Sequence, residues 1–111
     1  MIKSFGNKTK VAVFISGRGT NLKSLFYFSK NKNSRVQICI VISNKKNAKG
    51  LNFAKKHNIK FQIYTFKNRF KDELKVLQIL KKKNIKIICL AGFMKILSKE
   101  FIKRFKGKII N

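Results

Sequence analysis

The sequence predicts an α/β fold built on a doubly wound, mostly parallel sheet with strand order 3-2-1-4-5, a Rossmann-like arrangement. Short runs of branched apolar residues, typical of strands buried on both faces, alternate with segments whose apolar residues recur at helical spacing. A glycine turn also connects the first apolar run to the first helical segment. Such alternation favours right-handed crossovers and therefore parallel strand pairing.

The first part of the chain contains three strands and two helices by this reasoning. Residues 1–9 are expected to be a basic lead-in, and residues 10–111 to form the domain. Within the domain we expect strands at 11–15, 36–42 and 61–66 and helices at 21–30 and 48–56. Thr20 or Asn21 could cap the first helix, and Asn58 is expected to end the second.

The remainder of the chain continues the same pattern. We expect helices at 70–83 and 98–105 and strands at 85–90 and 108–110. In the predicted strand order the first and fourth strands are neighbours at the point where the order reverses. The loops 16–21 and 92–97 and the segment beginning at Asn111 should therefore share one crevice at the carboxyl ends of the strands.

The charge balance predicts attraction to anions without identifying one. There are 28 Lys and Arg residues against three Asp and Glu residues, a formal net charge of +25. The lysines are spread along the chain beside abundant Asn, Ile and Phe, as AT-rich codons would produce, so no specific nucleic-acid partner is expected. A hydrophobic content of 44%, including 11 Phe residues, predicts a folded chain.

Further sequence features concern the cellular environment. No apolar run approaches the roughly 20 residues of a membrane span, and no signal peptide is recognisable, so we expect a cytoplasmic protein without a membrane partner. Cys39 and Cys89 lie within apolar runs and are interpreted as buried free thiols in a reducing compartment. Neither has metal-ligand spacing, so no metal is expected.

Two loops carry the candidate chemistry. Residues 16–22, Ser-Gly-Arg-Gly-Thr-Asn-Leu, form a glycine turn before a helix, where free N–H groups and the helix dipole can hold a phosphate. A tight turn with an Asn cap is the alternative. Residues 90–98 place apolar side chains after a buried strand, where a flat heterocycle could bind. From this run alone, simple packing of a helix onto the sheet by Phe93, Met94, Ile96 and Leu97 is the favoured interpretation.

Four segments resemble one family in order and approximate spacing: residues 15–22, 41–45, 90–97 and 107–111. The family is the folate-dependent phosphoribosylglycinamide formyltransferases of purine biosynthesis, the glycinamide ribonucleotide transformylases. The resemblance covers nearly the whole chain from Lys10 onward, and about the first half of the family's domain. It implies formyl transfer from 10-formyltetrahydrofolate to the amine of glycinamide ribonucleotide.

The resemblance also implies residue roles. Substrate phosphate would be bound by Gly19, Thr20 and Asn21. The folate pterin would be bound by the segment Met94, Lys95, Ile96 and Leu97, through main-chain groups, with Lys67 near a basic position over the folate. The family commonly has Arg where Lys95 stands. The exchange matters little if the backbone makes the contact, whereas a stacked or bidentate guanidinium contact would be lost.

The resemblance identifies Asn111 with the family's catalytic asparagine, whose amide can donate to a developing oxyanion. The family's catalytic His follows two positions later and an Asp lies further on, so the 111 residues alone are expected to be inactive. His57 is interpreted as a solvated helix end rather than a substitute. The three acidic residues, Asp72, Glu73 and Glu100, are expected on helix surfaces.

Other functions remain open at this stage. Formyltetrahydrofolate deformylase shares the fold but generally lacks the Ser-Gly-x-Gly-Thr/Ser-Asn loop, and methionyl-tRNA formyltransferase also differs in its first loop. The chain could instead bind nucleic acid nonspecifically through its lysines, or be an inactive fragment. The sequence does not indicate an oligomeric state.

Overall fold

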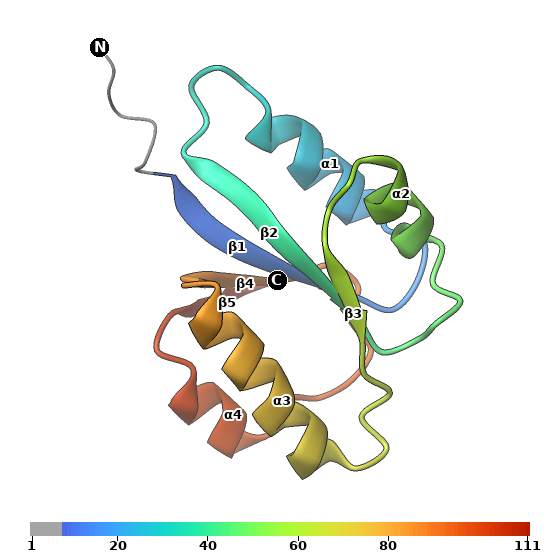
Figure 1. The fold of residues 1–111 in the computed structure, drawn as a ribbon, viewed down its shortest axis with the longest axis vertical. Coiled ribbons are helices and arrows are strands. Elements are labelled where there is room, and N and C mark those ends of the chain that lie inside the picture. The colour runs from blue at the N-terminus through green and yellow to red at the C-terminus, as the bar shows by residue number, and fades with distance from the viewer. Residues whose placement is uncertain (1–7) are drawn as a thin grey trace.

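The computed structural model describes residues 8–111, and within them five parallel strands form one sheet with helices on both faces (Figure 1). Residues 1–7, most of the expected basic lead-in, lie outside the described residues. The elements in chain order are β1 (Thr9–Ile15), α1 (Thr20–Ser29), β2 (Val36–Ser43), α2 (Gly50–Lys56), β3 (Phe61–Ile63), α3 (Arg69–Lys82), β4 (Ile87–Leu90), α4 (Lys99–Arg104) and β5 (Lys108–Ile110).

The strand order is β3-β2-β1-β4-β5, and every neighbouring pair is parallel, which confirms the predicted fold class. β1 lies at the centre: Val13 pairs with Val41 of β2 on one side and with Cys89 of β4 on the other. β1 and β4 are therefore adjacent although about 70 residues separate them along the chain. This adjacency brings the segments that follow the two strands to the same edge of the sheet.

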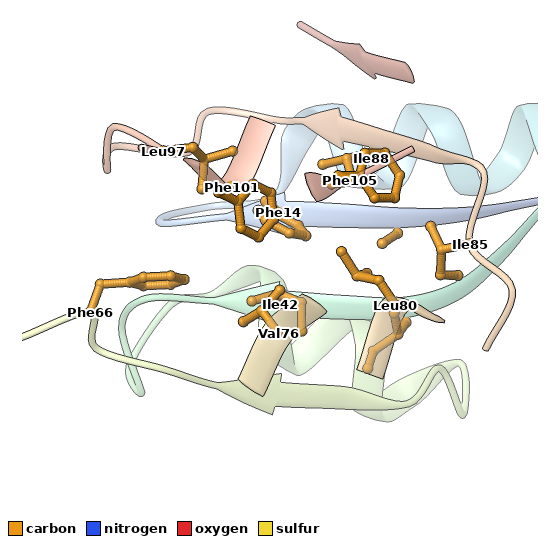
Figure 2. Packing of buried hydrophobic residues seen from close by; sticks show 12 residues of the cluster. Phe14, Ile42, Phe66, Val76, Leu80, Ile85, Ile88, Leu97, Phe101 and Phe105 are labelled. Atoms are coloured by element: carbon orange, nitrogen blue, oxygen red, sulfur yellow. The ribbon is translucent and has the colours of Figure 1, made fainter. Parts of the chain in front are cut away.

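Alternate residues of β1 bury their side chains against opposite helix layers, because successive side chains of a strand point to opposite faces. Val11, Val13 and Ile15 pack with residues of α1 and α2. Ala12 and Phe14 pack with residues of α3 and α4, and Figure 2 shows Phe14 close to Phe101 in this second layer. Complete burial of a Val, Ile or Phe side chain stabilises the fold by roughly 1.5–3 kcal/mol.

Some predicted element boundaries are wrong, and turn geometry gives the reasons. β3 ends at Ile63 instead of residue 66, because Phe66 has a left-handed backbone (φ 62°) and its N–H donates to Asp72 Oδ2 at 2.9 Å. β4 begins at Ile87 instead of residue 85. The Ile85 N–H is taken by the carbonyl of Leu80, which closes the end of α3.

The predicted environments of several side chains also need correction. Glu73 is buried, not on a helix surface: its carboxylate accepts the Ser98 N–H at 2.8 Å and the Ser98 hydroxyl at 2.5 Å. His57 is half-buried, with its ring centroid 4.2 Å from that of Phe53. Cys39 and Cys89 are free but only half-buried, and this partial burial raises the pKa of the Cys89 thiol.

Residues 8–111 include no helix that is long and apolar enough to cross a membrane.

Candidate functional site

A hollow of about 380 Å³ lies where β1 and β4 end, and it is the candidate site. Its lining comes from three segments that are distant in sequence: residues 16–21, Lys45, and Ala91, Gly92 and Met94. We call residues 16–21 the cradle loop and residues 92–97 the Met94 loop. The expectation that the two loops meet in one crevice is confirmed, because both contribute to this lining.

The cradle loop leads into α1 with free N–H groups. Gly19 is the N-cap and has a left-handed backbone (φ 80°, ψ 24°), and no side chain makes a capping hydrogen bond. Thr20 and Asn21 are therefore not caps, contrary to the prediction. The first intrahelical bond runs from the Lys23 N–H to the Gly19 carbonyl at 2.9 Å, so the preceding N–H groups have no acceptor within the helix. This helix end can accept an anion.

Gly50, the first residue of α2, packs against the cradle loop and forms a hydrogen bond with it. Its N–H donates to the Gly17 carbonyl at 2.9 Å. A Cβ on Gly19 would lie 2.6 Å from the Gly50 Cα, and a Cβ on Gly50 would lie 2.6 Å from Ile15 Cδ1. The Gly50 backbone therefore leaves no room for a side chain at Gly19, whereas a Cβ on Gly50 would displace the end of the Ile15 side chain.

Ser16 connects the cradle loop with the Met94 loop. Its hydroxyl donates to the Asn44 side-chain oxygen and accepts the N–H of Met94 at 2.7 Å. Both Ser16 and Asn44 are buried, with exposed fractions of 5% and 6%. Buried polar groups of this kind are almost always hydrogen-bonded, and here the bonds fix how the two loops lie relative to each other.

The Met94 loop is anchored by the side chains at its two ends. The Phe93 ring makes edge-to-face contacts with Phe14 and Phe66, at centroid distances of 5.3 and 5.7 Å. Leu97 is buried in the core beside Phe101, as Figure 2 shows. Between these anchors Met94 and Ile96 expose 77% and 80% of their surface. Packing alone therefore explains part of this run but not its exposed middle.

The structure gathers only some of the residues to which the resemblance assigns a role. Gly19, Thr20, Asn21 and Met94 line the hollow together. Five others are not part of its lining: Lys67, Lys95, Ile96, Leu97 and Asn111. Asn111 is nevertheless at the same edge of the sheet, because it directly follows β5, whose Ile110 pairs with Cys89 of β4.

The comparison with protein families decides the classification. Residues 9–111 match the family model described as formyl transferase. The chain belongs to the formyl transferase family. Among curated members, it is 42% identical over 108 residues to a trifunctional purine biosynthetic protein adenosine-3 from Gallus gallus, covering 95% of this chain and 11% of that protein. It is 38% identical over 105 residues to a phosphoribosylglycinamide formyltransferase from Haemophilus influenzae, covering 92% of this chain and 50% of that protein.

Solved structures of formyl transferases show the same fold. A phosphoribosylglycinamide formyltransferase from Brucella melitensis superimposes with a TM-score of 0.86 at 33% identity, over 92% of this chain and 55% of that one. A second, from Coxiella burnetii, gives a TM-score of 0.83 at 31% identity, over 92% of this chain and 49% of that one. The chain thus spans about half the length of these single-function relatives.

Side chains that line the candidate site carry positive charge. Arg18 and Lys45 are exposed and contribute to its lining.

A larger hollow of about 750 Å³ lies at the opposite end of the sheet and is lined in part by Lys55, Lys60 and Lys82. No glycine turn or helix N-terminus belongs to that lining, so it lacks the converging N–H groups of the cradle loop. Within residues 8–111 no group of three potential metal ligands occurs.

Sequence reasoning assigned no individual role to four contributors to this site: Ser16, Asn44, Lys45 and Gly50. Ser43 and Asn44 follow directly on the apolar residues of β2, and polar residues in such a position are a usable signal for a site at the sheet edge. Gly50 gave no such signal, because it lies in a helix and its importance depends on the approach of a distant loop.

Proposed function

We propose that this chain supplies the phosphate-binding cradle and part of the folate pocket for transfer of a formyl group from 10-formyltetrahydrofolate to the amine of glycinamide ribonucleotide. One observation carries the proposal. The uncapped N-terminus of α1 and the exposed apolar part of the Met94 loop border the same hollow, so two ligands could meet there. The relationship to phosphoribosylglycinamide formyltransferases supports this choice of ligands.

The cradle loop suits a phosphate monoester. Backbone N–H groups of Thr20 and Asn21 would donate to phosphate oxygens, and the positive end of the α1 dipole would stabilise the charge. Arg18 and Lys45 are exposed at the same hollow and add positive charge. The absence of a side-chain cap on α1 is favourable here, because a capping carboxylate or amide would occupy the position of the phosphate.

The Met94 loop suits the flat ring of a folate. Exposed Met94 and Ile96 side chains could cover a ring face, while main-chain N–H and C=O groups could bind its polar edge. Lys95 belongs to the Met94 loop, and Lys67 follows Phe66, whose ring packs against Phe93 of that loop. Both lysines are exposed and would attract the carboxylates of the folate tail. Leu97 would contribute through its backbone, since its side chain belongs to the core.

Formyl transfer requires attack of the substrate amine on the formyl carbon, collapse of the tetrahedral intermediate and release of the folate nitrogen. Asn111 would donate from its side-chain amide to the oxyanion of that intermediate. The amine must lose a proton and the folate nitrogen must gain one, which calls for a general acid–base group. His57 does not suit this role, because its ring packs against Phe53 and Phe26 away from the hollow.

We therefore expect the 111 residues alone to bind ligand without catalysing formyl transfer. Incubating the chain with glycinamide ribonucleotide and 10-formyltetrahydrofolate should give no formylated product above a protein-free control. Sustained turnover would contradict this expectation. The reaction would belong to purine biosynthesis, as the name of the Gallus gallus relative supports. A cytoplasmic location stays a prediction from the sequence.

The cradle assignment is tested by Asn21→Asp, which keeps the size of the side chain but adds a negative charge. A carboxylate beside the phosphate should weaken glycinamide ribonucleotide binding at least about tenfold, measured by calorimetric titration. Because an acidic residue in the first turn stabilises a helix, the loss could not be attributed to unfolding. Asn33→Asp makes the same change of net charge in an exposed turn and should leave the affinity unchanged. Equal affinities for all three proteins would exclude the cradle.

The net charge of +25 favours a second candidate function, nonspecific binding of nucleic acid. The two functions differ in their salt dependence. Binding of single-stranded DNA through phosphate neutralisation should fall linearly with salt on a log–log scale, with a slope that grows with the number of contacts. One ribonucleotide phosphate in a defined cradle should give a shallow slope. Asn21→Asp should affect the ribonucleotide far more than the DNA.

A further inference from the structure

One buried hydroxyl connects three segments of the site. Ser16 directly follows β1 and precedes the glycine turn. Its side chain forms hydrogen bonds both to Asn44, after β2, and to Met94, after β4. Within residues 8–111 the bond from Met94 N to Ser16 Oγ is the one hydrogen bond that joins the cradle loop to the Met94 loop. Any shift of one loop relative to the other must therefore alter this bond.

Asn44 determines how that hydroxyl is used. A serine hydroxyl has a single proton to donate and two lone pairs to accept with. Because the proton goes to Asn44 Oδ1, a lone pair is left facing the Met94 N–H. Asn44 is itself buried, so water could not easily replace it as the acceptor.

We propose that Ser16 and Asn44 are a positioning pair that couples the two ligand sites, so that occupancy of the cradle loop raises the affinity of the Met94 loop for folate. This inference rests on the proposed function and adds a mechanism to it. A phosphate that orders the cradle loop also fixes the Ser16 hydroxyl and, through it, the Met94 backbone. Thermodynamic linkage makes the effect reciprocal, and typical coupling factors are about 5–150-fold.

The experiment measures the coupling factor directly. Glycinamide ribonucleotide is titrated into the chain with and without saturating tetrahydrofolate, and the ratio of the two dissociation constants is the coupling factor. We expect a factor of at least about 5 for the unaltered chain and about 1 for Ser16→Ala, which retains no acceptor for Met94 N–H. Ser16→Thr keeps the hydroxyl and should restore most of the coupling.

Ser29→Ala is the matched control. Ser29 is also 5% exposed and its hydroxyl donates to the Phe26 carbonyl at 2.6 Å, but it lies at the far end of α1. The Ser29→Ala variant also removes a buried hydroxyl and should keep the full coupling factor; its loss of stability should be smaller, because the Phe26 carbonyl still accepts the Lys30 N–H. A wild-type factor in Ser16→Ala, or a factor of 1 in the unaltered chain, would overturn the inference alone. Failure of the unaltered chain to bind either ligand would overturn the proposed function and the inference with it.

A second measurement needs no variant, in case Ser16→Ala does not fold. The Met94 amide proton is followed by NMR in the unaltered chain while glycinamide ribonucleotide is added without folate. The inference predicts a shifted Met94 resonance and slower hydrogen exchange at this amide, because the bond to Ser16 tightens. An unchanged Met94 signal, together with shifts at Thr20 and Asn21 that report binding, would overturn the coupling and leave the cradle intact.

Discussion

The two loops that border the hollow are held in place by different means. The cradle loop is fixed by backbone: the Gly50 N–H binds the Gly17 carbonyl, and Gly19 passes Gly50 with no room for a side chain. The Met94 loop is fixed by side chains, with Phe93 packed against the core and Leu97 buried in it. An anion site made of N–H groups needs an exact backbone path, whereas an apolar slot needs only that its ends are anchored.

The difference predicts where each loop is vulnerable. Removal of a core aromatic ring that packs against Phe93 should destabilise the Met94 loop. Addition of a single carbon atom at Gly19 should destabilise the cradle loop. The exposed side chains of both loops should matter for ligands and little for stability. Single substitutions with matched controls separate these contributions, from the largest expected loss of stability to the smallest.

Phe66→Ala should have the largest effect on stability. Phe66 is one of the buried residues of the core layer that contains Phe14 (Figure 2). Its ring contacts Phe93 at a centroid distance of 5.7 Å, and truncation removes this contact and leaves a cavity. The free energy of unfolding should fall by about 3–5 kcal/mol, measured by urea denaturation. Phe70→Ala removes a ring that is 63% exposed and should cost under about 0.5 kcal/mol. Similar losses at both positions would show that the Met94 loop is not supported by this contact.

Gly19→Ala tests the backbone packing of the cradle loop. The new Cβ would meet the Gly50 Cα at 2.6 Å, and the backbone has a positive φ that disfavours alanine. We expect a loss of about 2–4 kcal/mol in the free energy of unfolding. Gly17→Ala is the control within the same loop: a Cβ there meets no atom within 4 Å, so the change should be within about 0.5 kcal/mol. The reverse ranking would contradict the close approach of Gly19 and Gly50.

Glu73→Ala tests the carboxylate that secures the end of the Met94 loop. Without it, the Ser98 N–H and hydroxyl lose their acceptor, and thermal unfolding should report a loss of about 1–3 kcal/mol. The comparison variant is Glu100→Ala, which breaks only the exposed 3.8 Å pair with Arg104 and should cost less than about 1 kcal/mol. If Glu100→Ala were the more damaging of the two, the buried carboxylate would have no special role.

Met94→Ala and Ile96→Ala should change stability least. Both side chains are largely exposed, so the free energy of unfolding should stay within about 0.5 kcal/mol of the unaltered value. Tetrahydrofolate affinity should nevertheless fall several-fold in each variant, measured by fluorescence titration, because apolar cover for the ring is lost. Unchanged affinity in both would place the folate ring elsewhere.

Much of the fold was predictable because strand and helix patterns are local. Runs such as Ile38–Ile42 and the helical spacing around Leu74, Leu77 and Leu80 identify their elements without reference to the rest of the chain. The boundaries that failed depend on turn hydrogen bonds that a strand or helix pattern does not reveal. β3 ends before Phe66, whose N–H donates to Asp72, six residues later, and whose backbone is left-handed. Phe has no preference for a left-handed backbone, so the sequence did not predict this turn.

The candidate site was predictable in part for the same reason. Glycines before a helix predict either an anion site or a tight capped turn, and Gly19, Thr20 and Asn21 do line the hollow. The residues that hold the loops were not predictable. Ser16, Asn44 and Gly50 come from three segments and act only through contacts made after folding. Glu73 was misplaced on a surface because its partner, Ser98, lies 25 residues away.

The sequence by itself determined the order of strands and helices, the glycine turn before α1 and the excess of positive charge, since these depend on neighbouring residues and on composition. Only the tertiary structure decided that Gly50 supports the cradle loop, that Asn44 accepts the Ser16 hydroxyl proton and that Ser16 bonds to Met94. The physical reason is that hydrogen bonds and close packing act over a few ångströms, so they select partners only after the chain has brought distant residues together.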